Sequence, residues 1–340
     1  MKKIEKNARQ KNQEEAYKII KDIAESYKEK PEVLAELFQF GSRFYQYSPR
    51  NTQLIYGQNP GATYVASYAA WKKMEYPVKK GECGLKILVP TPITYLKIEN
   101  EWRSMKSTSK EQIEEAKAGR IESKQVNAYK VGYVFDISQT CCPPEKYPEF
   151  YDVGYRSEQH AAVADGIAAF SKDVLHCPVA SGDLKSISLR GFYSPGQNSI
   201  VINENLNDTQ KLSTLTHELG HAMIHNEASD TSTVQKEFEA DAVSIMLSEQ
   251  FGLEVTDPRK RHLAKHYEKF AEDIGQQEGK DLDACLNEVF SNVYNVYRKH
   301  VDSITQYVEQ SVQIKELAQG FKAGLHGPYN KRSIGMGLDN

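Results

Sequence analysis

The chain of 340 residues lacks the segments that would place it in or across a membrane. It contains no run of about 18 apolar residues, so no transmembrane helix is expected. Its basic opening, "MKKIEKNARQ", is not followed by the apolar stretch that a secretory signal peptide requires. We therefore expect a cytoplasmic protein with no membrane partner.

Cysteine is scarce, and its pattern argues against two classes of protein. The odd number of cysteines and the absence of any C-x-x-C spacing are untypical of a disulfide framework or a cysteine zinc site. Reduced thiols in the cytoplasm fit this pattern better. The five cysteines are Cys83, Cys141, Cys142, Cys177 and Cys285.

No internal repeat is visible. The spacing of apolar residues and the positions of prolines and charged stretches predict an α+β protein with two domains. Residues 12–57 have apolar positions at helical spacing, and from Val78 the alternation becomes strand-like. Residues 106–124 are highly charged, so we expect a solvated excursion between two strands. Prolines in "SQTCCPPEKYPEF" mark an inter-domain linker. The predicted boundaries are 1–140 for a first domain, 141–150 for the linker, 151–325 for a second domain with a helical extension, and 326–340 for a disordered tail.

The second half reads as helices around a small group of strands. A helix is expected over "SEQHAAVADGIAAFSKDV", and "GFYSPGQNSIVIN" reads as two strands joined by a Ser-Pro-Gly turn. Asp208 or Thr209 can cap the next helix, which should end near His225. Another helix is expected from Thr233 to just before Gly252, and charged helices follow from about 258 to 318. The strand "NSIVIN" could be an edge strand that binds an extended peptide, but for its individual residues, such as Ile200 and Val201, a place in the core is the preferred interpretation.

The segment "TLTHELGHAMIH" combines a helical apolar stripe with a pattern typical of metal chemistry. His217 and His221 are four residues apart, so both project from one helical face and can bind one ion. Glu218 lies between them, where it can take a proton from metal-bound water as a general base. This is the H-E-x-x-H pattern of zinc peptidases. The alternative is a core helix whose histidines have ordinary hydrogen-bond partners.

The third metal ligand must come from elsewhere. His225 is rotated about 40° further round the helix, so we interpret it as a pocket or structural residue. In "QKEFEADAVSIML", Glu237 and Asp241 share one helical face. We expect His217, His221 and Glu237 to hold Zn²⁺ with a position left open for water, and Asp241 to orient a ligand histidine. Glu239 is the second choice as ligand, or else an exposed helix acid.

Charge is divided unevenly along the chain. Residues 1–140 hold 24 basic and 17 acidic side chains, against 19 and 29 in the remainder. Interleaved bases and aromatics in the first half could hold single-stranded DNA through phosphate contacts and base stacking. The alternative is that the aromatics form the core and the charges are scattered over solvated faces. The candidate contacts are Arg50, Asn51, Tyr56, Tyr68, Trp71, Lys72, Lys73, Lys79 and Lys80.

Several motifs taken together resemble the ArdC family of anti-restriction proteins, which plasmids and other mobile elements carry. They are Tyr47-Ser48-Pro49-Arg50-Asn51, "SYAAWKKMEYPVKKGE", "VFDISQT" and the later His-Glu-Leu-Gly-His. The resemblance spans about residues 12–250. It implies a first domain that binds single-stranded DNA and a second, zincin-like (gluzincin) domain similar to the ImmA/IrrE metallopeptidases. Their zinc ligands fall on His217, His221 and Glu237, and their catalytic base on Glu218. The excursion at 106–124 and the helices after 258 look like additions.

The resemblance favours a protein that protects incoming mobile DNA from host restriction and whose peptidase cleaves or captures an unknown host protein. Its activity would be either constitutive or latent until DNA binds. One alternative is a DNA-coating protein whose zinc site is structural or vestigial. The presence of Glu218 argues against it, because a purely structural site needs no base beside the ion. Another is an ImmA-like peptidase that cleaves a transcriptional repressor and needs no affinity for DNA.

Overall fold

The computed structural model describes residues 2–147, 155–185, 189–225 and 231–325, and it confirms an α+β protein with two compact units. Unit 1 comprises Met1–Val153 and Val255–Asn295, and unit 2 comprises Gly154–Glu254 and Val296–Asn340. Within the described ranges, no helix is both long and apolar enough to cross a membrane. Part of the predicted linker and the predicted disordered tail lie outside the described residues.

Helices form the first layer of unit 1, and they match the helical spacing of the sequence. These are α1 (Lys2–Glu29), α2 (Val33–Arg43) and α3 (Pro49–Gln58), followed by the short α4 (Tyr68–Lys73). The side chain of Ser48 caps α3 by accepting the backbone N–H of Asn51, and Pro49 occupies the first turn, where its missing N–H costs nothing.

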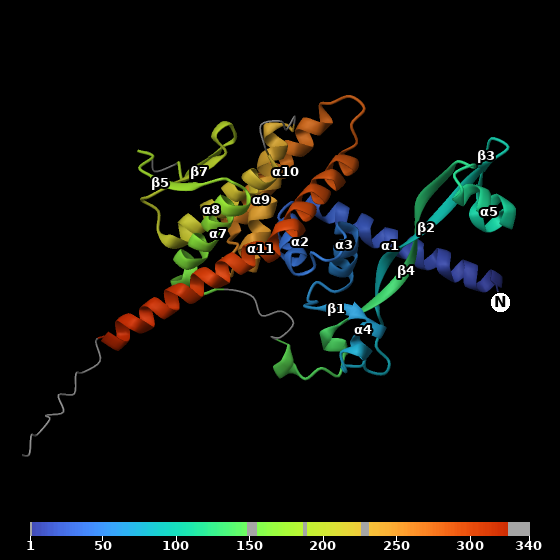
Figure 1. Cartoon of the computed structure of the whole chain (residues 1–340), viewed down its shortest axis with the longest axis horizontal. Helices are drawn as coiled ribbons and strands as arrows, with labels where there is room; N and C mark the ends of the chain where they lie inside the picture. Colours follow the sequence, from blue (N-terminus) through green and yellow to red (C-terminus); the bar gives the residue numbers. More distant parts are fainter. Residues whose placement is uncertain (1, 148–154, 186–188, 226–230, 326–340) are drawn as a thin grey trace, which may run out of the picture. The chain divides into compact units, whose positions relative to one another are not determined.

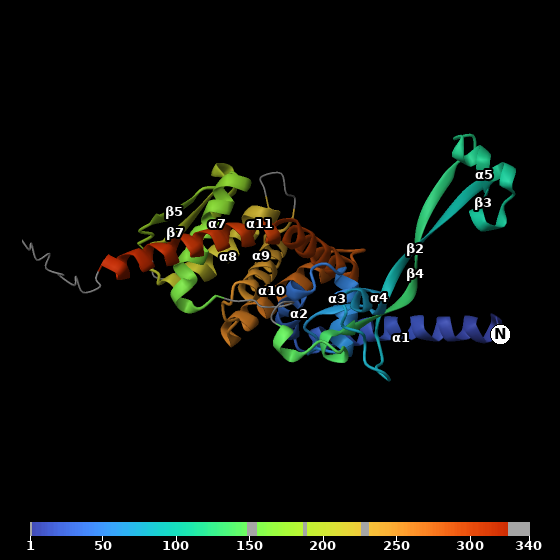
Figure 2. The same ribbon diagram turned by 60° about the horizontal axis from the view of Figure 1, so that its bottom comes forward.

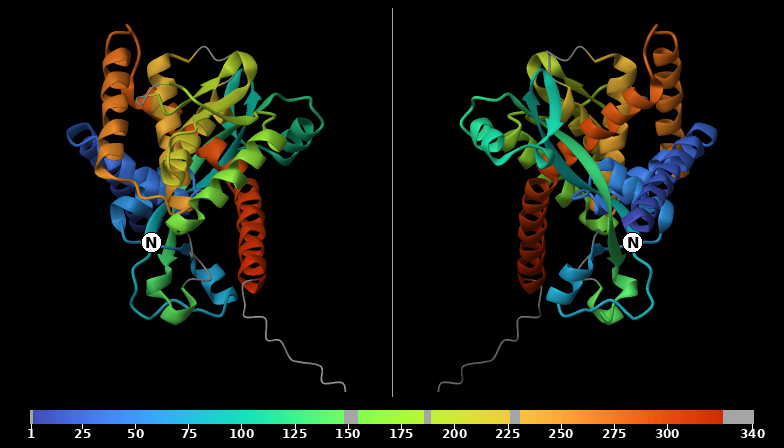
Figure 3. Two further views of the ribbon diagram at one scale, coloured as in Figure 1. Left: turned by 90° about the vertical axis from the view of Figure 1, so that its left-hand side faces the viewer. Right: turned by 90° about the vertical axis from the view of Figure 1, so that its right-hand side faces the viewer.

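Unit 1 also contains a four-stranded antiparallel sheet (Figure 1). Its order is β1 (Val65–Ser67), β4 (Ser123–Asp136), β2 (Leu85–Ile98) and β3 (Glu101–Ser104). The strands β2 and β4 pair along nearly their whole length and form a long ribbon (Figures 2 and 3). The charged excursion lies at the far end of this ribbon. It contains α5 (Lys110–Lys117), which has no buried residue, as expected for a solvated segment.

The C-terminal helices are divided between the two units. The helix α10 (Asp257–Gly275) and the first turns of α11 (Leu282–Leu325) pack in unit 1, where Tyr267 and Phe290 contact the ring of Tyr27. Gly41 of α2 lets Tyr294 approach so closely that an added Cβ would lie 2.0 Å from its hydroxyl. The sequence-based boundary placed all of 151–325 in the second domain, whereas residues 255–295 complete the core of the first.

Unit 2 surrounds a three-stranded sheet with helices. The helix α7 (His160–Val174) precedes β5 (Val179–Gly182), β6 (Gly191–Ser194) and β7 (Ser199–Asn203), and α8 (Asp208–Ile224) and α9 (Thr233–Gln250) follow. The sheet order is β5-β7-β6, so "NSIVIN" is the central strand and not an edge strand. The buried side chains of Ile200 and Ile202 explain the difference, because they fill the core. Within the described part of this sheet, β6 is an edge strand.

Short 3-10 turns connect several of these elements. They lie at Met105–Ser107, Ile137–Gln139, Pro144–Lys146, Ser157–Gln159 and Pro195–Gln197.

Candidate metal centre

The helix α8 carries the two histidines and the glutamate of the H-E-x-x-H pattern. It begins with a capping box in which Asn207 and Gln210 satisfy each other's backbone N–H groups. The cap is therefore Asn207 rather than the expected Asp208 or Thr209. The apolar stripe of the helix, which includes Leu212, is buried, and this fixes the direction in which His217, Glu218 and His221 point.

The helix α9 packs against α8 at a very short distance, and a glycine makes this possible. A Cβ added to Gly220 would lie 2.9 Å from the carbonyl oxygen of Ala240. Any other residue at position 220 would push the two helices apart. The glycine inside His-Glu-Leu-Gly-His therefore brings the acids of α9 close to the histidines of α8.

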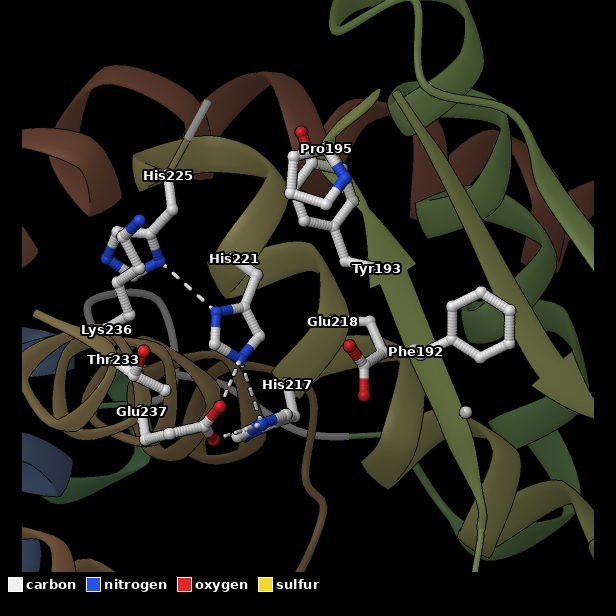
Figure 4. Close-up of a pocket in the computed structure, with 11 residues that line it drawn as sticks. Phe192, Tyr193, Pro195, His217, Glu218, His221, His225, Thr233, Lys236 and Glu237 are labelled. Atoms are coloured by element: carbon white, nitrogen blue, oxygen red, sulfur yellow. Dashed lines mark hydrogen bonds and ion pairs between the residues drawn. The ribbon is translucent and has the colours of Figure 1, made fainter. Parts of the chain in front are cut away.

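Three side chains from the two helices converge on one point (Figure 4). The Nε2 atoms of His217 and His221 are 3.3 Å apart. The Glu237 carboxylate lies 3.5 Å from Nε2 of His217 and 3.6 Å from Nε2 of His221. Two imidazole nitrogens and one carboxylate oxygen, all within 4.8 Å of one another, suit a divalent cation.

The electrostatics of this cluster favour a positive charge at its centre. Burial lowers the pKa of His217, but hydrogen bonds to Asp241 and Glu237 outweigh burial and raise it to about 10. Hydrogen bonds from His217 and His221 in turn hold the pKa of Glu237 well below its usual range. The Asp241 carboxylate lies 2.8 Å from Nδ1 of His217. The carboxylate therefore accepts a hydrogen bond from the Nδ1–H of His217, which leaves Nε2 available for a metal.

The apparent affinity for a divalent cation should rise with pH. A metal ligand must be deprotonated, and the raised pKa of His217 means that the metal-free cluster holds a proton at neutral pH. Displacing one proton predicts a gain of about tenfold per pH unit between pH 6 and 8. Titration calorimetry in buffers of different ionisation enthalpy measures the proton released. A pH-independent affinity would contradict this electrostatic account.

Glu218 lies outside the ligand cluster but beside it. Its carboxyl group lies on the side of β6, away from Glu237 (Figure 4). Burial raises the pKa of Glu218, as suits a group that must take up a proton, although the nearby His217 and the backbone of Tyr193 oppose this shift. Together with the cluster, Glu218 lines a cavity of about 420 Å³ that the edge strand β6 borders through Phe192 and Tyr193.

The positions of Glu239 and His225 differ from, or add to, what the sequence predicted. Glu239, expected to be a ligand or an exposed acid, is fully buried and is not one of the three convergent groups. Its carboxylate lies 2.8 Å from Nε2 of His225. His225 is buried at the end of α8, in the pocket as expected. The helical spacing of "EFEAD" favoured Glu237 as the ligand but gave no sign that Glu239 is buried.

Three of the candidate DNA contacts in unit 1 are structural. The Asn51 side chain is buried and bonds both the carbonyl and the N–H of Leu88, at 3.0 and 2.8 Å. Trp71 is fully buried and donates its indole N–H to the carbonyl of Phe135. Tyr56 is half-buried against the core and bonds Glu36 through its hydroxyl. These side chains serve the fold, as the alternative interpretation of the aromatics allowed.

The remaining candidates are exposed, although the amine of Lys79 donates to the carbonyl of Ser138. Tyr68 retains 55% of its side-chain accessibility, and Arg50 and the four lysines are also exposed. Sequence reasoning missed two further exposed aromatics, Tyr129 and Tyr133 on β4. The alternation of β4 could have revealed them, because both occupy the same face of that strand. The exposed lysines are Lys72, Lys73, Lys79 and Lys80.

A histidine pair on one helix, a glutamate on the next and a buried acid beside them define a metallopeptidase-like domain that suits a divalent metal. Residues 172–274 match the IrrE N-terminal-like domain, a peptidase family. Residues 9–135 match the N-terminal domain of the anti-restriction factor ArdC. With both domains in this order, the two matches support an ArdC-family protein.

Individual relatives are between 16% and 29% identical to this chain over the aligned residues. The chain is 29% identical over 317 residues to an uncharacterised protein of Bacillus anthracis, with 86% of this chain and 52% of the relative covered. It therefore spans about half the length of that relative. Crystal structures of the antirestriction protein ArdC from plasmid R388, metal-free and Mn(II)-bound, are 16% identical with a TM-score of 0.43. They cover 78% of this chain, and 86% and 85% of their own chains.

Proposed function

We propose that this chain is an anti-restriction protein of a mobile element that binds single-stranded DNA and hydrolyses a host protein with a zinc-dependent peptidase site. The observation that carries the peptidase proposal is Glu218. Its buried carboxyl lines the cavity next to three convergent ligands yet is not one of them. A purely structural metal site has no use for such a group.

In this proposal, His217, His221 and Glu237 hold Zn²⁺, for which two histidines and a glutamate are a common catalytic ligand set. When bound, the ion supplies Lewis acidity that activates water and polarises a peptide carbonyl. Glu218 takes the proton of the attacking water as the new C–O bond forms. It then delivers that proton to the leaving amine as the C–N bond breaks, so the carboxylate is regenerated.

The substrate would lie along β6. Among the described strands, β6 pairs with β7 alone, and its residues line the cavity beside Glu218. An extended peptide can pair with the outer edge of such a strand, and main-chain hydrogen bonds then hold it largely independently of its sequence. The half-exposed Phe192 would contact a substrate side chain.

Unit 1 would bind the DNA. Its candidate contacts are the exposed cations and the exposed Tyr68, which could meet phosphates and stack on a base, respectively. The buried Asn51 and Trp71 are excluded from this role because their polar atoms already bond the backbone. Binding to DNA would keep the peptidase near a host nuclease acting on the same molecule.

A restriction-protection assay tests the proposal in cells. Transfer of unmodified plasmid into a restricting host should increase when the chain is expressed and should lose that increase with Glu218→Gln. A Lys72→Gln/Lys73→Gln variant should also protect less. If Glu218→Gln protects as well as the wild type, proteolysis is not the mechanism and a DNA-coating protein explains the protection. If neither variant changes transfer, the proposed function fails.

A further inference from the structure

We propose that His225 and Glu239 form a positioning relay that holds the ligand nitrogen of His221 ready for the metal. The inference rests on the metal site of the proposed function and deepens it. It concerns His225, which lines the cavity, and Glu239, which lies buried behind it. In the relay, the carboxylate of Glu239 orients His225, and His225 orients His221.

The contacts form an unbroken chain. Nδ1 of His221 lies 3.2 Å from Nδ1 of His225 (Figure 4). Nε2 of His225 lies 2.8 Å from Oε2 of Glu239. The other oxygen of that carboxylate accepts the side-chain N–H of Gln235 at 3.1 Å. His225 and Glu239 are both buried, so water does not compete for these bonds.

The protons along this chain can be assigned from hydrogen-bonding rules. A carboxylate only accepts, so Nε2 of His225 must carry a hydrogen. In a neutral imidazole the second nitrogen is then an acceptor, so Nδ1 of His225 receives a hydrogen from Nδ1 of His221. His221 is thereby left without a hydrogen on Nε2. That nitrogen is the one that lies 3.3 Å from Nε2 of His217, at the point where the ligands converge.

The two ligand histidines are therefore oriented in different ways. The carboxylate of Asp241 lies 2.8 Å from Nδ1 of His217 and contacts it directly. The imidazole of His225, in contrast, lies between His221 and Glu239. The spacing explains the difference. His225 is the C-cap residue of α8, four residues after His221, and it bridges to Glu239 on α9. The carboxylate of Glu239 thus orients the metal ligand His221 indirectly, through His225.

Removing the nitrogens of His225 should weaken metal binding without emptying the site. A His225→Phe variant keeps a ring of similar size but can neither accept from His221 nor donate to Glu239. Loss of such a partner costs about 10- to 100-fold in metal affinity. Competition of the full chain with a chromophoric chelator for Zn²⁺ measures the change. The matched control is Ser244→Ala, which breaks another buried contact between α8 and α9, the 2.9 Å bond to Thr216, and should leave the affinity unchanged.

A second measurement needs no variant. Long-range ¹⁵N–¹H spectra of zinc-loaded wild type, with histidine labelled, report which nitrogen of each ring carries the hydrogen. The proposal expects His225 with its hydrogen on Nε2. A hydrogen on Nδ1 of His225 would overturn the relay, as would equal affinities of wild type and His225→Phe. If the wild type binds no zinc, the proposed function fails instead, so the two failures are distinguishable.

Discussion

A Glu218→Gln variant is expected to hydrolyse peptides about 10³-fold more slowly than the wild type, because general-base catalysis contributes typically 10²- to 10⁴-fold. Glutamine has nearly the same shape but cannot take a proton from water. The change should appear in kcat/KM with a library of unstructured fluorogenic peptides. Because Glu218 is not among the three convergent ligands, zinc affinity should stay within a few-fold of the wild type.

The matched control for this variant is Glu237→Gln. It removes a carboxylate of the same length, one helix away, but from the ligand cluster. It should lose both hydrolysis and zinc affinity, whereas Glu218→Gln should lose hydrolysis alone. Wild-type turnover by Glu218→Gln would remove the general base from the account. A loss of zinc by Glu218→Gln would make that residue a ligand.

Binding to single-stranded DNA should weaken steeply with salt. If Arg50 and the four exposed lysines each neutralise one phosphate, the slope of log affinity against log salt is about −3.5. Affinity should then fall by about 10²-fold between 50 and 200 mM salt. Fluorescence anisotropy with labelled oligonucleotides measures the slope, and duplex of the same sequence should bind more weakly because its bases cannot stack on Tyr68.

Charge-matched variants separate a defined DNA surface from general attraction. Lys72→Gln/Lys73→Gln should reduce the magnitude of the slope by about 1.4, at about 0.7 for each lost contact. Lys106→Gln/Lys110→Gln removes the same charge from the exposed excursion near α5 and should change the slope little. Equal effects of the two pairs would contradict the proposed contacts. No binding at low salt would remove DNA from the function.

Local sequence patterns predicted the helices of the second unit and its strands β6 and β7 but not β5, because such patterns act over one or two helical turns or a single strand pair. The spacing of His217 and His221 and the shared face of Glu237 and Asp241 depend only on helical geometry. Which face of α9 meets α8 depends on packing across 20 residues of sequence. That packing decides that Glu239 is buried beside His225, and no local pattern encodes it.

The unit to which the C-terminal helices belong could not be predicted for a similar reason. The helix α10 is strongly charged and reads as an appendage, yet Tyr267 supplies a ring to the core around Tyr27. In the first unit, aromatic and basic residues alternate along the sequence. This pattern alone does not distinguish aromatics that stack on nucleobases from aromatics that pack in the core. The contacts with Leu88 and Phe135 resolve this by placing Asn51 and Trp71 inside.

The most direct test of the account is the metal content of the purified full chain after incubation with Zn²⁺ and removal of free ion, measured by elemental mass spectrometry. The account predicts one equivalent of zinc in the wild type and in Glu218→Gln, and far less in His217→Ala and Glu237→Gln. Wild type without zinc, or His217→Ala with a full equivalent, would contradict the assignment of this cluster as the metal centre.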